Sequence, residues 1–78
     1  MPFRIDDNVI TFDGHCSVEE AQPLYDALRG MEAPIFDFGR ASGLHTAIVQ
    51  IVLASGGGLR GMPEDRVLAA CFADVKRS

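Results

Sequence analysis

The residue pair His45-Thr46 carries the side chains with the clearest chemical potential, because it directly precedes a long apolar stretch. A phosphate on Thr46 at a helix start would face unpaired backbone N–H groups and the positive end of the helix dipole. Threonine at this place also commonly caps the helix, and local sequence alone favours that role. His45 is a poor candidate base for Thr46, since adjacent helical residues rarely face each other and no acid is placed to orient the ring. Thr46 is therefore a candidate phosphorylation site, and His45 is expected at the surface.

Histidine and cysteine, the usual ligands of zinc, each occur twice, as His15, Cys16, His45 and Cys71. None of their spacings matches the C-x₂-C or H-x₃₋₅-H patterns that are typical of zinc sites, so the sequence predicts no metal. Cys71 falls on an apolar helical stripe, which predicts a position in the core. We expect no other cofactor, because no cofactor-binding fingerprint occurs.

The acidic residues do not form a catalytic arrangement. Asp37 lies inside an apolar segment, where a carboxylate must stand at the exit of the strand or accept backbone hydrogen bonds. The glycine-rich segment Gly56–Gly61 lacks the Lys-Ser/Thr ending of a phosphate-binding loop and follows a predicted helix instead of a strand. With no carboxylate pair and no Ser-His-Asp set, the sequence predicts that this chain is not an enzyme.

The segment Ala33–Ser55 positions Thr46, and it reads as a buried strand, a short polar connection and an apolar helix. Pro34 prevents a helix from entering the segment, and strand-forming residues follow up to Gly39: Ile35, Phe36 and Phe38. From Leu44 onward apolar residues recur with helical spacing: Leu44, Ile48, Ile51 and Val52. The three glycines 56–58 then end the helix, because glycine readily adopts the left-handed conformation that closes helices.

Two short strands are expected before this unit, Phe3–Asp6 and Val9–Asp13, joined by a tight turn at Asp7-Asn8. Gly14 is expected to end the second strand. The resulting order of elements, including the helices described next, is β-β-α-β-α-α. It predicts a small α/β domain in which helices cover one face of a mixed sheet.

The flanking helices are predicted from their end signals. Ser17 and Glu20 fit a capping box for a helix that runs to about Gly30. Pro23 is discordant there: either the helix kinks, or its regular part starts near this residue. The last segment, Pro63–Arg77, fits a helix with Pro63 at its first position and basic residues in its last turn, and a buried strand is the competing interpretation.

Length and charge bound the possible functions. The 78 residues suit one domain, 1–78, whose core is small enough that a partner or a second copy would help to stabilise it. A net charge of −4 argues against nucleic-acid binding, which requires clustered Lys and Arg. Neither a secretory signal nor an apolar run long enough to enter a membrane is apparent. Two cysteines without paired spacing are typical of reduced thiols, so we expect a cytoplasmic protein.

Two short motifs resemble those of STAS domains, the fold of bacterial anti-sigma-factor antagonists: Phe36-Asp37-Phe38-Gly39-Arg40 and Leu44-His45-Thr46-Ala47. Such domains carry an apolar strand that ends in Asp, a short loop, and then Asp-Ser/Thr-Ser/Ala/Gly opening a helix. Ile10-Thr11-Phe12-Asp13-Gly14 resembles another strand of the family. Pro23-Leu24-Tyr25 resembles a segment of the STAS subunit of bacterial lipid-transporting ABC systems. The resemblance covers Val9 to Leu53, with His45 in place of the usual Asp.

The resemblance implies a STAS-like α/β fold of three or four strands, in the order β-β-α-β-α-(β)-α, with the later strand either reduced to Gly58-Leu59-Arg60 or lost. It implies a regulatory, protein-binding function, with Thr46 at the position that is phosphorylated in the antagonists and contacts the ATPase in the transporter subunit. The implied partner-binding residues are Arg40, Ser42, Gly43, His45, Thr46 and Gln50. The implied partner is an anti-sigma factor or kinase; the alternative is an ABC ATPase. Because a shortened sheet exposes an edge, we also expect a homodimer or a partner-bound form.

Overall fold

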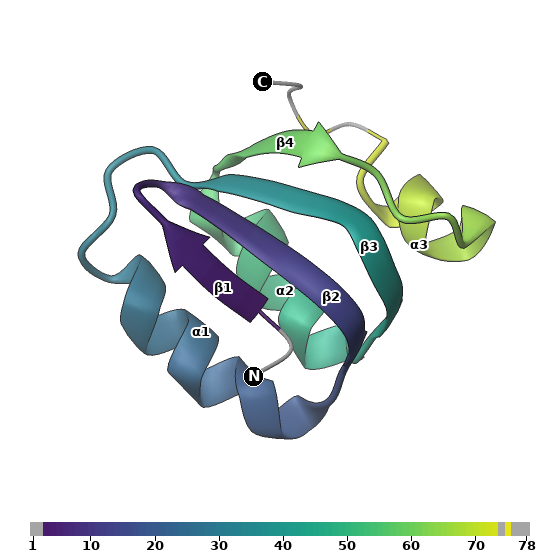
Figure 1. Cartoon of the computed structure of the whole chain (residues 1–78), viewed down its shortest axis with the longest axis horizontal. Helices are drawn as coiled ribbons and strands as arrows, with labels where there is room; N and C mark the ends of the chain where they lie inside the picture. The colour runs from purple at the N-terminus through teal and green to yellow at the C-terminus, as the bar shows by residue number, and fades with distance from the viewer. Residues whose placement is uncertain (1–2, 74, 76–78) are drawn as a thin grey trace.

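The computed structural model describes residues 3–73 and 75 of the chain. In chain order its elements are β1 (Phe3–Asp6), β2 (Val9–Cys16), a 3₁₀ turn (Val18–Glu20), α1 (Ala21–Leu28), β3 (Ile35–Leu44), α2 (Thr46–Ser55), β4 (Gly58–Gly61) and α3 (Arg66–Cys71). Figure 1 shows the strands as one layer, with α1 and α2 behind it. The predicted small α/β fold is therefore confirmed.

The sheet is mixed, with its four strands in the order β1-β2-β3-β4. β1 runs antiparallel to β2, while β2, β3 and β4 are parallel neighbours. Because parallel neighbours need a crossover connection, α1 joins β2 to β3 and α2 joins β3 to β4. Both helices lie on the same face of the sheet, and no helix of the described part covers the opposite face (Figure 1).

Phenylalanine side chains make up five of the thirteen core residues of the described part, on the face that the helices cover. The sheet register places Ile10 beside Phe36 and Phe36 beside Leu59, and all three side chains are fully buried. The ring of Phe38 lies between two other rings of the core. It stacks on Phe12 at 4.7 Å and on Phe72 at 4.8 Å between ring centroids. The helices add Leu24 from α1 and three residues of α2: Ile48, Val49 and Val52.

The entry into α1 differs from the prediction. The 3₁₀ turn follows Ser17, but the Ser17 side chain makes no capping hydrogen bond to any described residue, so the predicted capping box is wrong. Pro23 is the third residue of α1, within the first turn, where backbone N–H groups have no intrahelical acceptor. The proline therefore fits the start of the regular helix. α1 ends at Leu28, two residues before the predicted limit at Gly30.

β2 and β3 are longer than predicted. β2 continues through Gly14, which has φ of 75° at an irregularity in the register, and ends at Cys16. β3 does not end at Gly39 but continues to Leu44, so the predicted polar connection is wrong. The physical reason is pairing: the residues of the expected connection lie in register with the extended part of β2 and satisfy their backbone groups there.

The transition from α2 to β4 depends on glycine. Gly56 ends α2 in the left-handed conformation, with φ of 74°, as predicted. A side chain at Gly57 would collide with the carbonyl oxygen of Pro34 and with the ring of Phe36. The absence of a side chain thus lets the chain approach β3 and form β4. Of the two alternatives that the resemblance left for this strand, reduced or lost, the structure shows the reduced strand.

The C-terminal helix is confirmed as a helix over residues 66–71, but its predicted start at Pro63 is wrong. Asp65 caps α3 instead, because its Oδ1 accepts hydrogen bonds from the N–H groups of Val67 at 2.8 Å and Leu68 at 3.1 Å. The predicted basic residues of the last turn, at 76 and 77, lie outside the described residues. No helix of the described part is long and apolar enough to cross a bilayer.

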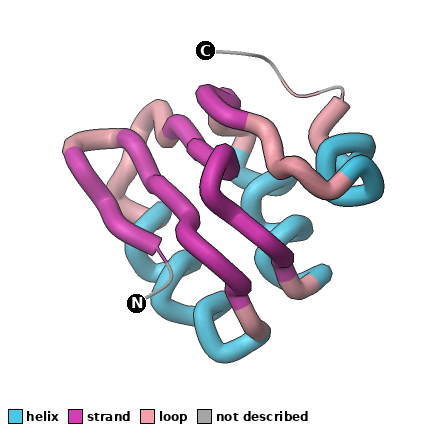
Figure 2. Tube along the Cα trace, turned by 45° about the vertical axis from the view of Figure 1, so that its right-hand side comes forward, coloured by secondary structure: helices cyan, strands magenta, loops and turns pink. Residues whose placement is uncertain are grey.

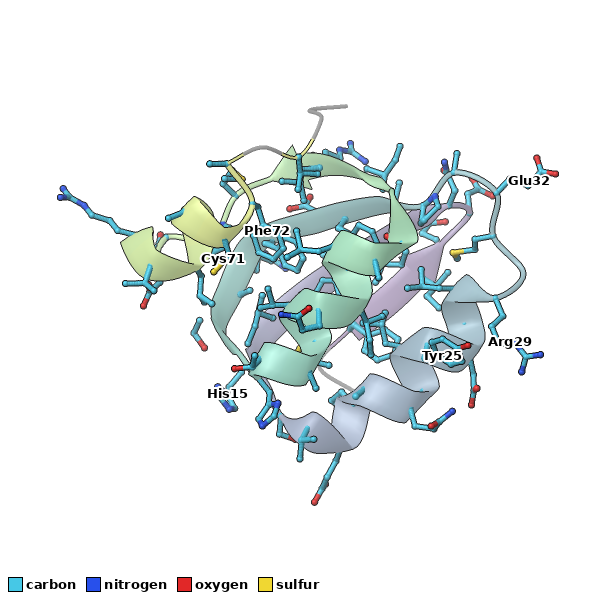
Figure 3. The ribbon with its side chains drawn as sticks, turned by 180° about the vertical axis from the view of Figure 1, so that it is seen from behind. His15, Tyr25, Arg29, Glu32, Cys71 and Phe72 are labelled. Carbon is cyan, nitrogen blue, oxygen red and sulfur yellow. The ribbon has the colours of Figure 1, made fainter. Side chains whose placement is uncertain are left out.

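Cys71 is exposed, so its predicted core position is wrong. The next residue, Phe72, takes that position with 1% of its surface exposed. Figure 3 shows the two side chains at the end of α3 that faces the sheet. The shift by one residue follows from the stacking of Phe72 on Phe38, which buries a larger apolar surface than a thiol would.

Candidate functional site

Thr46 is the first residue of α2, and its side chain is exposed. β3 ends two residues earlier, at Leu44, so the helix begins directly beyond a strand of the sheet. The predicted placement of this hydroxyl, at a solvent-accessible helix start next to the sheet, is therefore correct. Thr46 does not cap the helix, however, because it already has a helical position.

His45 is the residue that caps α2. Its backbone is extended, with φ of −64° and ψ of 147°, and its Nδ1 accepts a hydrogen bond from the N–H of Ala47 at 3.0 Å. The expectation of a threonine cap is therefore wrong, whereas the expected surface location of His45 is correct. His45 thus caps the helix, whereas the neighbouring Thr46 is exposed and makes no capping contact.

The start of α2 is fastened to the end of β2. The N–H of His45 donates a hydrogen bond to the carbonyl oxygen of Cys16 at 2.9 Å. Cys16 is fully buried, and burial, followed by the nearby charge of Glu20, raises the pKa of its thiol to about 11. At neutral pH this thiol stays protonated, so it is a packing residue and not a nucleophile.

Gly43 and His15 form a tight contact beside the helix start. The two residues are paired in the register of β2 and β3, and a Cβ added at Gly43 would lie 2.7 Å from Nδ1 of His15. The imidazole of His15 thus occupies the space that a side chain at position 43 would take. Figure 3 shows His15 next to the beginning of α2. Pairing across the sheet, which the sequence did not predict, brings this second histidine to the site.

Arg40 and Ser42 are exposed on the last half of β3. Arg40 lies opposite Asp13 in the register, and its Nη1 is 3.8 Å from Oδ2 of that carboxylate. Both side chains are about two-thirds exposed, at 69% and 67%, so the pair contributes little to stability. Of the predicted partner-binding residues, Arg40 is thus engaged with β2, while Ser42 is exposed close to the helix start.

Gln50 lies one turn beyond Thr46 on α2 and is exposed. It also lines a groove of about 460 Å³ between α1 and α2, whose walls are mostly apolar: Tyr25, Leu28, Met31, Pro34, Ile51 and Ala54. Tyr25, on α1, is 53% exposed there. Figure 3 shows the two helices side by side on this face. The sequence does not predict the groove, because its walls come from segments that are distant in the chain and meet only in the fold.

Asp37 is half-buried on β3, and its Oδ1 accepts a hydrogen bond from the N–H of Gly39 at 2.9 Å. Of the two arrangements expected for a carboxylate in an apolar strand, a place at the strand's exit or a hydrogen bond from the backbone, the structure shows the hydrogen bond. The same oxygen occupies the place of a side chain at Gly61, so the carboxylate fills the irregularity between β3 and β4. Across residues 3–73 and 75, no three His, Cys, Asp or Glu side chains are grouped to hold a metal ion.

A comparison of the chain with models of known protein families finds no match, and a comparison with curated proteins finds none that is significant. The STAS resemblance therefore stays a prediction from the motifs around β3 and α2.

Proposed function

We propose that this chain is a non-catalytic, STAS-like interaction module that binds a partner protein through the start of α2. The observation that carries the proposal is the exposed hydroxyl of Thr46 at the first position of α2, directly beyond β3. Exposed polar side chains with no role in the core are available for recognition. Thr46 meets this condition because His45, one residue earlier, performs the capping.

Rigid support makes the helix start suitable for binding. The hydrogen bond from His45 to the carbonyl of Cys16 and the cap on Ala47 fix the backbone on both sides of Thr46. A contact surface on fixed elements loses little conformational entropy when a partner docks. The exposed residues of this surface are Ser42, His45, Thr46 and Gln50.

Phosphorylation of Thr46 is the proposed switch. A phosphate would add about −1.5 to −2 charges at pH 7. One N–H group of the first turn, that of Ala47, is already bonded to His45, so the helix end has fewer donors for the phosphate. The added charge therefore acts on the surface presented to the partner and weakens the contact with an apolar or acidic partner. The proposed partner is an anti-sigma factor or its kinase in the bacterial cytoplasm.

The second candidate function is that of an accessory subunit docked on an ABC ATPase. The groove between α1 and α2 favours it, because Tyr25 and Gln50 extend the exposed surface from the helix start across both helices. Stable protein interfaces bury about 800 Å² on each partner, and tyrosine is enriched in them. In this function Thr46 is a contact and needs no modification.

Site-directed photo-crosslinking tests the proposal. A photoreactive amino acid at position 46 is compared with one at position 67, because Val67 is 75% exposed on α3, a helix that contributes no residue to the proposed surface. The expected result is one partner captured from position 46 and not from position 67. An anti-sigma factor or sigma-regulating kinase supports the first function, and an ABC ATPase supports the second. Capture of the same proteins from both positions contradicts binding through the start of α2.

A further inference from the structure

The edge strand β1 presents backbone groups that pair with no strand among residues 3–73 and 75. Figure 2 shows β1 as the outermost strand of the sheet. Its hairpin with β2 has a two-residue turn, which makes Asp6 and Val9 a hydrogen-bonded pair. Hydrogen-bonded and non-bonded pairs alternate in antiparallel strands, so the N–H and C=O of Ile5 point outward from the edge.

The side chains of β1 are arranged symmetrically about Ile5. Arg4 and Asp6 flank it, and both are exposed on the face of the sheet that the helices leave uncovered. The Ile5 side chain is on the other face, opposite Ile10, and 44% of it is exposed. One basic and one acidic residue at equal spacing from a central apolar residue form a self-complementary sequence.

We propose that β1 pairs antiparallel with β1 of a second copy of this chain, with Ile5 facing Ile5 across a two-fold axis. In this register each Arg4 lies directly opposite Asp6 of the second copy, which places two oppositely charged pairs across the junction. The outward N–H and C=O of the two Ile5 residues bond to each other, and the exposed parts of their side chains come into contact. The result is a continuous sheet of two copies.

The other edge does not offer the same match. β4 has the sequence Gly58-Leu59-Arg60-Gly61, so Arg60 is its one charged residue. A two-fold pairing of β4 either places Arg60 opposite Arg60 of the second copy or places it opposite an uncharged residue, because β4 contains no acidic side chain. Pairing through β1 is isologous, so it closes as a dimer and does not propagate into a fibre. It also leaves the start of α2 unoccupied and does not depend on the proposed function.

Sedimentation equilibrium on the whole chain, up to about 1 mM, tests this pairing. Arg4→Asp and Asp6→Arg each place like charges opposite each other, so each variant alone should dimerise roughly tenfold more weakly than wild type or worse. An equimolar mixture of the two variants restores both opposite-charge pairs, because one chain then carries two acids and the other two bases. The mixture should dimerise within about threefold of wild type.

A second variant tests the backbone contact by itself. Ile5→Pro removes the outward N–H without breaking the ladder to β2, so the variant should fold with an unchanged circular dichroism spectrum but stay monomeric. The proposal is overturned if the wild type stays monomeric throughout the concentration range. It is also overturned if the charge variants dimerise like wild type, if their mixture fails to recover, or if folded Ile5→Pro still forms the dimer.

Discussion

Nδ1 of His45 lies 3.0 Å from the backbone nitrogen of Ala47 and accepts its hydrogen. This contact assigns the capping of α2 to histidine and leaves the hydroxyl of the next residue, Thr46, at the surface. In a helix capped by its threonine, the hydroxyl would be engaged with the backbone. The division of roles between the two residues is what makes Thr46 available for a partner.

The cap can be tested by its effect on stability. His45→Ala should lower the free energy of unfolding by about 1 kcal/mol, the typical cost of a lost N-cap, whereas His45→Asn should retain most of it. Thr46→Ala, at an exposed position without capping contacts, should change it by less than about 0.5 kcal/mol. Urea unfolding followed by circular dichroism measures all three. Equal losses for His45→Ala and Thr46→Ala would show that threonine shares the cap.

The contact between Gly43 and His15 predicts a rescue. Gly43→Ala should destabilise the fold by about 1–2 kcal/mol, because the new methyl group displaces the imidazole of His15. In a His15→Ala background the same change should cost less than half as much, since the ring is gone. A double-mutant cycle from urea unfolding gives the interaction energy. Additive losses would mean that the ring does not occupy this space.

The attachment of α3 to the sheet depends on Phe72. Phe72→Ala removes a buried ring that stacks on Phe38 and should cost about 3–5 kcal/mol. The matched control is Val67→Ala on the same helix, where 75% exposure predicts a change below about 0.5 kcal/mol. Thermal unfolding compares the two variants. If Phe72→Ala unfolds at the temperature of the control, α3 is not anchored as described.

The two cysteines should differ in reactivity. Cys71 is exposed and should be alkylated by iodoacetamide within minutes at pH 8, whereas buried Cys16 should react only as the chain unfolds. Mass spectrometry of the native and the urea-unfolded chain locates the label. Labelling of Cys16 in the native chain at the rate of Cys71 would contradict its burial.

The raised pKa of Cys16 also predicts a dependence of stability on pH. Burial raises that pKa from 9.0 to about 11, so the folded chain holds the thiol proton after the unfolded chain has released it. The associated stabilisation is complete below pH 9 and is lost as the pH rises toward 11. Cys16→Ala should therefore lose stability less steeply than wild type across this interval. Parallel slopes for the two chains would contradict the raised pKa.

The order of elements could be predicted because apolar periodicity and glycine or proline punctuation are local signals. They located both strands of the hairpin, β3 and all three helices. The length of β3 could not be predicted in this way. Its second half contains Gly39, Arg40 and Gly43, which are typical of loops, and it becomes a strand because β2 pairs with it. Pairing partners distant in sequence decide such cases.

The candidate site shows the same limit. The position of Thr46 at the start of α2 followed from the change of period near Leu44, but the cap did not, because Thr is a far commoner cap than His. His15 reaches the site only through its register opposite Gly43. Local sequence patterns identify where α2 begins. The side chains next to that helix start, such as His15, are brought there by strand pairing, which local patterns do not predict.

The most direct test of the central claim is the affinity of the partner that position 46 captures for variants of Thr46, measured by isothermal titration calorimetry. Thr46→Glu should weaken binding at least about tenfold while the circular dichroism spectrum stays unchanged, because its charge stands where a phosphate would. Val67→Glu, which adds the same charge on α3, should leave the affinity unchanged. If Thr46→Glu and Thr46→Ala both bind as tightly as wild type, the start of α2 is neither a switch nor a contact.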